Sequence, residues 1–139
     1  MDQPRRLAIS LLMLRLGVFV VMLMWTVDKF VRPEHAAGVF SNFYGISGLD
    51  AQIAYVLGAL ELVLLLAFVA GIARRWSYGI VLVLHAVSTF STWSQYLQPF
   101  EGPNLLFFAA WPMLAACAAL YLLRDSDLYT VGGAGRANA

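Results

Sequence analysis

Three ionisable residues, Arg15, Glu61 and His85, lie inside long apolar stretches of the sequence. A charged side chain at the centre of a membrane helix costs at least about 2.5 kcal/mol, so such a residue needs a partner or a function. A guanidinium and a carboxylate can form a bidentate ion pair, and an imidazole takes up and releases a proton near neutral pH. These residue types predict a buried ion pair with a titratable histidine beside it.

The positions of the three residues along their apolar segments predict that they meet. Arg15 comes eight residues into the first segment and His85 eight residues into the third, so both lie about 12 Å deep at a rise of about 1.5 Å per residue. Glu61 precedes the end of the second segment by eleven residues, which places it about 16 Å deep from the same side. We expect Arg15 and Glu61 to form an ion pair across two antiparallel helices, with His85 facing the same interior point.

A polar stripe follows His85 along the third segment. Its members recur at helical spacing: Ser88, Thr89, Thr92 and either Gln95 or Tyr96. In a membrane such a stripe contacts other helices or water rather than lipid. We expect a polar cavity that runs outward from His85, with aromatic surface from Trp111 beside it. Its outer mouth would be formed by Gln95 together with Lys29 and Asn104.

Each of these features also has a purely structural interpretation. An ion pair between Arg15 and Glu61 can serve only to set the register of two helices. His85 can be a hydrogen-bonded interior residue, and hydroxyl side chains can join helices at about 0.6 to 2 kcal/mol per bond. No metal site is expected, because the other histidine, His35, lies at a different depth and further ligands are missing. The single cysteine, Cys117, cannot form an intramolecular disulfide.

The elements that would position these residues are membrane-spanning helices. Hydrophobic residues make up 61% of the 139 residues and charged residues 12%, compared with about a quarter charged in a soluble domain. Four segments approach the roughly 20 apolar residues that cross a bilayer: residues 7–27, 51–72, 77–97 and 105–123. The third is the most polar. The sequence predicts an all-α, four-helix transmembrane bundle over residues 1–130, followed by a flexible, glycine-rich tail at 131–139.

The distribution of basic residues predicts the orientation of this bundle. Five arginines fall on one side of the four-span arrangement: Arg5, Arg6, Arg74, Arg75 and Arg124. Only Lys29 and Arg32 fall on the other side. Since basic residues of short loops remain in the cytoplasm, both termini are expected there.

In the first outer loop, Pro33 and recurring aromatic residues predict a short amphipathic helix at the outer interface. The net charge of +1, with scattered arginines, excludes a nucleic-acid-binding protein.

Several short motifs of this chain resemble those of a known family. They are Arg15, the pair Lys29-Phe30, Glu61 within Gly58-Ala-Leu-Glu-Leu-Val, and the pair Arg74-Arg75. Over roughly residues 14–124 the chain is similar to the DoxX family of small four-helix bacterial membrane proteins. The resemblance implies a multi-pass protein of the bacterial cytoplasmic membrane. The family takes its name from a subunit linked to thiosulfate:quinone oxidoreduction, and relatives are associated with methylamine dehydrogenase maturation and oxidative-stress complexes.

Three classes of function remain open. The first is an accessory or anchoring subunit of a membrane redox system, rather than a stand-alone enzyme, that holds a redox partner protein and a quinone beside His85 and Glu61. The second is a structural or assembly module without a small-molecule site, in which the pair of Arg15 and Glu61 is architecture. The third is a small proton-coupled transporter that works as a homo-oligomer, with Glu61 and His85 as its protonatable residues.

Overall fold

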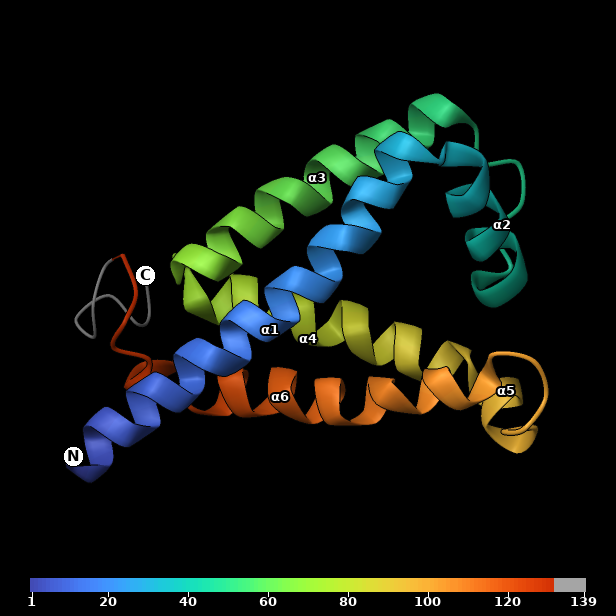
Figure 1. Ribbon diagram of the computed structural model, residues 1–139. Helices are drawn as coiled ribbons and strands as arrows, with labels where there is room; N and C mark the ends of the chain where they lie inside the picture. The colour runs from blue at the N-terminus through green and yellow to red at the C-terminus, as the bar shows by residue number, and fades with distance from the viewer. Residues whose placement is uncertain (132–139) are drawn as a thin grey trace.

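The computed structural model describes residues 1–131, and these residues contain helices and no strands. Four long helices form two antiparallel pairs, α1 with α3 and α4 with α6 (Figure 1). Their bounds are Gln3–Val31 for α1, Ala51–Ala70 for α3, Arg74–Ser91 for α4 and Ala110–Leu122 for α6. The prediction of an all-α protein is confirmed. The predicted flexible tail begins at Val131, whose N–H donates to the carbonyl oxygen of Ala70 (2.9 Å). The other residues of this tail, 132–139, lie outside the described residues.

Local signals in the sequence explain where the first helix pair begins and ends. The side chains of Asp2 and Asp50 accept hydrogen bonds from backbone N–H groups three residues later, at 3.1 and 2.9 Å, and so cap α1 and α3. Gly71 ends α3 with a φ of +73°, a conformation that glycine adopts without steric cost. The chain then reverses into α4, which begins at Arg74.

Three helical stretches within residues 1–131 are long and apolar enough to cross a membrane: Gln3–Val31, Ala51–Ala70 and Asn104–Leu122. The third predicted span, residues 77–97, is not one continuous helix. Helix α4 ends at Ser91, and the short helix α5 (Trp93–Leu97) follows after Thr92. The last stretch begins as a 3-10 helix, η1 (Asn104–Ala109), and continues as α6. Pro112 lies in the first turn of α6, where its missing N–H breaks no α-helical hydrogen bond.

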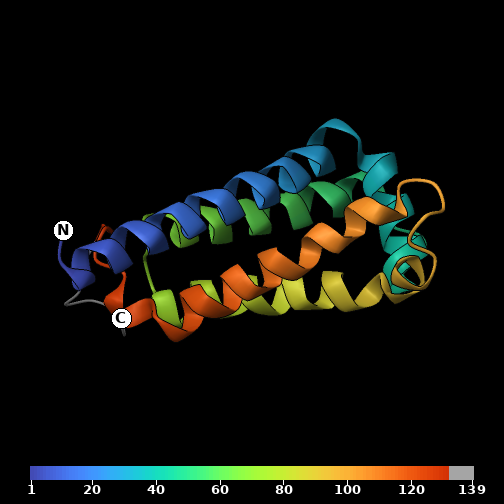
Figure 2. The same cartoon turned by 60° about the horizontal axis from the view of Figure 1, so that its bottom comes forward.

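The two helix pairs pack closely at one end and diverge at the other (Figure 1). The buried core lies at the end that holds the N-terminus. It includes Leu11 of α1, Phe68 of α3, Tyr78 of α4 and Leu120 of α6. Figure 2 shows the same separation into two layers, with α1 and α3 in one and α4 and α6 in the other. At the opposite end, the ribbons of the two pairs lie farther apart (Figure 1).

The helix predicted in the first loop is present as α2 (Pro33–Tyr44). It packs across the diverging end, where it contacts α1, α3 and α4 (Figure 1). The ring centroid of Phe43 lies 6.0 Å from that of Phe107, and the Tyr44 hydroxyl is 2.8 Å from that of Ser88. Helix α2 therefore covers the space between the two helix pairs. Its location at a membrane interface stays a prediction.

Candidate functional site

The predicted ion pair between Arg15 and Glu61 is wrong. Arg15 donates from Nε to the carbonyl oxygen of Val69 at 3.1 Å, so it lies near the end of α3. Glu61 accepts a hydrogen bond from Thr26 Oγ1 at 2.8 Å. Thr26 follows Arg15 by eleven residues, a distance of about 16 Å along the helix. The depth estimate failed because α1 is much longer than α3 and its N-terminal part extends beyond the end of α3 (Figure 1).

The partner of Arg15 is Asp127, which follows the last long helix. Arg15 Nη1 lies 2.5 Å from Asp127 Oδ2, and the two side chains are only 2% and 0% exposed. The hydroxyl of Tyr78 donates to the same Oδ2 at 2.6 Å and accepts from Arg15 Nη1 at 3.2 Å. Arg15 Nη2 donates to the carbonyl oxygen of Tyr129. The guanidinium is thus held on several sides by atoms of the protein.

Arg74 extends this buried cluster. Its Nη1 donates to the backbone carbonyl oxygens of Asp127 (2.5 Å) and Arg124 (3.0 Å). None of Asp127, Tyr78 and Arg74 was predicted from the sequence to belong to a buried site. A usable signal was present, because a buried arginine needs an acidic partner and Asp127 follows the last apolar segment on the side predicted for the termini. We call Arg15, Arg74, Tyr78 and Asp127 the C-terminal clasp.

A separate cavity of about 860 Å³ lies between the two helix pairs, closed at one end by α2. Its lining is mostly apolar, and the predicted residues that contribute to it are Lys29, Glu61, His85, Ser88 and Thr92. The structure thus brings together half of the predicted site residues. Tyr44 and Ser91 add two hydroxyl groups that the sequence analysis did not identify.

The other predicted site residues lie outside this lining. Arg15 belongs to the C-terminal clasp, and Thr89 is buried with its hydroxyl donating to the carbonyl oxygen of His85 at 2.7 Å. Trp111 packs edge-on against Phe90, with 5.6 Å between ring centroids. Gln95 is half-buried on α5, where its side-chain oxygen accepts from Ser94. Asn104 Nδ2 donates to the carbonyl oxygen of Gln98 at 2.9 Å. The predicted outer mouth at Gln95 and Asn104 is not part of the cavity.

One polar group of the cavity is the ion pair of Lys29 and Glu61. Lys29 Nζ lies 3.0 Å from Glu61 Oε2, and the two side chains are 11% and 17% exposed. The ring of Phe30 packs against Gly58, where a Cβ atom would come within 2.8 Å of Phe30 Cε2. The absence of a side chain at Gly58 therefore allows a close approach of α1 and α3. This close approach brings Lys29 and Glu61 to the same level of α1 and α3.

The second polar group contains His85 and two hydroxyls. His85 Nε2 is 3.0 Å from the carbonyl oxygen of Ala110. Because a carbonyl oxygen can only accept, this contact assigns the hydrogen to Nε2 and leaves Nδ1 of a neutral ring as an acceptor. Tyr44 Oη and Ser88 Oγ lie 2.8 Å apart, and one hydroxyl hydrogen serves that contact. The other hydroxyl hydrogen is available to a ligand.

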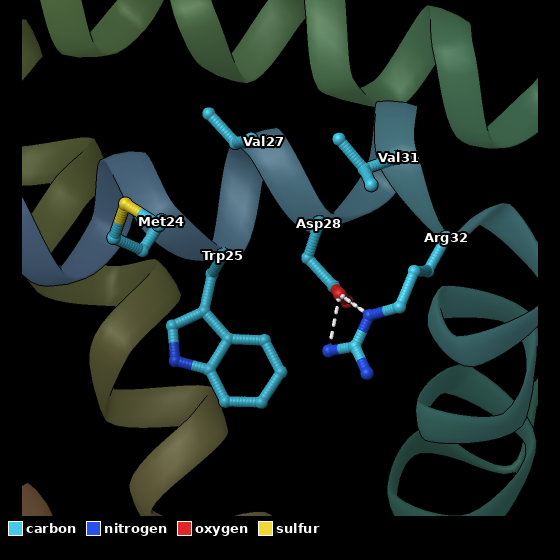
Figure 3. Close-up of a pocket in the computed structure, with 6 residues that line it drawn as sticks. All are labelled: Met24, Trp25, Val27, Asp28, Val31 and Arg32. Atoms are coloured by element: carbon cyan, nitrogen blue, oxygen red, sulfur yellow. Dashed lines mark hydrogen bonds and ion pairs between the residues drawn. The ribbon is translucent and has the colours of Figure 1, made fainter.

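A smaller pocket of about 360 Å³ lies against the end of α1 (Figure 3). Asp28 accepts from Arg32 Nε at 2.7 Å, and its second oxygen lies 2.5 Å from His35 Nδ1. The His35 ring stacks on Trp25 with 6.1 Å between centroids. Both carboxylate oxygens of Asp28 are therefore engaged in joining α1 to α2, which indicates a structural junction.

Within residues 1–131, no group of three or more His, Cys, Asp or Glu side chains is arranged to hold a metal ion. A scan against models of protein families finds no match for this chain, and searches of curated proteins and of solved structures find none either. The similarity to the DoxX family consequently stays a prediction. The features of this chain that bear on its function are the cavity and the C-terminal clasp.

Proposed function

We propose that this chain is a DoxX-like protein that crosses the bacterial cytoplasmic membrane four times, with both termini in the cytoplasm. Helix α4 is the least apolar of the four long helices, but its polar residues Ser77 and Thr89 are buried against the other helices. Its outward face carries exposed apolar side chains, among them Val83 and Phe90. An apolar outer face with a polar inner face is compatible with lipid on one side and protein on the other.

The arrangement of the chain ends supports this orientation. The N-terminus, the turn between α3 and α4, and the end of α6 lie at the same end of the molecule (Figure 1). The arginines of these three regions are therefore gathered on one side, whereas Lys29 and Arg32 lie at the other. Because basic residues accumulate on the cytoplasmic side, this end would be the cytoplasmic one.

The proposed function is to bind a membrane quinone as an accessory or anchoring subunit of a redox system. The observation that carries this proposal is the cavity of about 860 Å³, which combines a mostly apolar lining with a few polar groups. Small-molecule sites are typically about 300–1,000 Å³ and have this composition. A second protein would supply the electrons, and this chain would hold the quinone beside it.

The polar groups of the cavity suit both redox forms of a quinone. The carbonyl oxygens of the oxidised form accept hydrogen bonds, which Lys29 and the free hydroxyl hydrogen of the Tyr44–Ser88 pair can donate. The hydroxyl groups of the reduced form also donate, and His85 Nδ1 or Glu61 can accept from them.

The test is the quinone content of the protein purified in mild detergent. Organic extraction of the wild type should yield quinone in nearly equal molar amount to the chain. The variants Lys29→Met and His85→Phe should lose most of it, because each removes a polar group of the cavity. Gln95→Ala is the matched control, since it removes a polar side chain outside the lining. A wild type without quinone, or cavity variants with the wild-type content, would contradict the proposal.

A structural or assembly module is the second candidate. The C-terminal clasp favours it, because Arg15 is bound by Asp127, Tyr78 and backbone oxygens and does not line the cavity. On this proposal the cavity variants would leave both stability and association with a partner unchanged. The proton-coupled transporter stays a prediction of the sequence.

A further inference from the structure

We infer that the ligand of the cavity is an amphipathic lipid with a single apolar tail, which enters sideways from the bilayer and places its tail beside Gly17. This inference rests on the proposed function and specifies the ligand class and its orientation. Three properties of the cavity carry it: its length, the separation of its polar and apolar parts, and its exposed side.

The cavity is long and chemically asymmetric. Its lining residues on α1 extend from Met13 to Lys29, which are sixteen residues apart and therefore separated by about 24 Å. The charged pair lies at the end covered by α2, where Lys29 meets Glu61. Toward the other end, the lining is apolar on both facing helices: Met13, Leu14, Val18 and Val21 on α1, and Met113 and Ala116 on α6. A polar head group fits the first end, and an extended apolar tail fits the second.

The apolar part of the cavity is open at its side. Met13 contributes to the lining and is 68% exposed, and the lining residues Leu14 and Val21 are exposed as well. These residues lie on α1, one of the helices apolar enough to cross a membrane. The side opening would therefore face lipid tails rather than water. A ligand dissolved in the bilayer could enter without passing through an aqueous phase.

Gly17 lies beside this opening, in the middle of α1. It contributes to the cavity lining, and a Cβ atom at this position would have no other atom within 4 Å. Glycine is a poor residue for a helix interior, and here no neighbouring side chain requires its small size. The space beside it is available to a ligand. A larger side chain at position 17 would enter the proposed tail path, and its Cβ atom would meet no protein atom within 4 Å.

The experiment compares Gly17→Leu with Gly38→Leu. Gly38 lies on α2 outside the cavity lining, and a Cβ atom there also meets no atom within 4 Å, so the second variant controls for adding a leucine. Two probes are used, a benzoquinone without a tail and the same ring with a decyl tail. Binding is followed by quenching of tryptophan fluorescence, since Trp25 lines the cavity.

The wild type and Gly38→Leu should bind the tailed probe more tightly than the tail-free probe. Gly17→Leu should weaken binding of the tailed probe by about tenfold, as expected for overlap with an added side chain, and leave the tail-free probe unchanged. Equal binding of both probes by the wild type, or equal effects of Gly17→Leu on both, would overturn this inference while leaving the head-group site intact. If the wild type binds neither probe, the proposed function itself fails.

Discussion

Two ion pairs of different burial give this protein two different sites. The pair of Arg15 and Asp127 is almost completely buried, and both side chains also form hydrogen bonds with the Tyr78 hydroxyl. The pair of Lys29 and Glu61 is partly exposed and lines a cavity. A buried charge that loses its partner keeps its desolvation cost, whereas a partly exposed charge can be hydrated. At the residue scale, the first pair is suited to holding the chain together and the second to meeting a ligand.

Asp127→Asn should destabilise the protein by about 3 to 5 kcal/mol, because it leaves the Arg15 guanidinium buried without a counter-charge. Thermal unfolding in detergent measures the change. Asp125→Asn is the matched control, since Asp125 carries the same charge two residues earlier and is exposed. Equal stabilities of the two variants would show that the Arg15–Asp127 pair does not hold the fold.

At the scale of elements, the C-terminal segment joins helices that are distant in sequence. After the 3-10 helix η2 (Arg124–Ser126), Asp127 contacts α1 and α4 through Arg15 and Tyr78. The backbone of Val131 then bonds to the end of α3 at Ala70. This segment therefore closes the end of the molecule at which the helix pairs pack closely.

Gly71→Ala tests the packing of this segment on the turn after α3. Gly71 has a φ of +73°, and a Cβ atom there would overlap the side chain of Thr130. Gly45→Ala is the control, since Gly45 has a φ of +68° but no atom within 4 Å of an added Cβ. Backbone strain of about 1 to 2 kcal/mol applies to both variants, and only Gly71→Ala adds a clash. Thermal unfolding should show a larger loss of stability for Gly71→Ala than for Gly45→Ala. Similar losses of stability would mean that the C-terminal segment moves away from the added Cβ atom without an energetic cost.

At the scale of the whole molecule, the described surface is unusually apolar. Large hydrophobic side chains of α1, α3, α4 and α6 are exposed along their outer faces, including Met24, Val63, Val83 and Leu122. Soluble monomers rarely expose continuous apolar surface of this kind, whereas a bilayer is a suitable solvent for it. The outer surface and the candidate spans together indicate that lipid surrounds the helices.

The proposed orientation can be tested by introducing one additional cysteine at a time and applying a membrane-impermeant thiol reagent to intact cells. Phe100→Cys should be labelled, because Phe100 is highly exposed in the segment between α5 and η1 on the side opposite the termini. Gln3→Cys should be labelled only after the membrane is permeabilised. The wild type is the control, since its free cysteine, Cys117, is buried. Labelling of Gln3→Cys in intact cells would contradict cytoplasmic termini.

The presence of long apolar helices and much of their chemistry follow from local sequence, because these depend on neighbours within a few residues. The apolar segments and the helix after Pro33 were predicted from local pattern. The burial of Arg15 followed from its apolar surroundings.

Which side chains meet depends instead on packing between segments that are distant in the chain. The partner of Arg15 depends on how far α1 extends beyond α3 and on the return of a segment 112 positions later in the chain. Neither is encoded in helix periodicity, so the depth estimate paired Arg15 with the wrong acid. The cavity likewise arises from the divergence of two helix pairs and the placement of α2 across them, which depend on packing between distant segments.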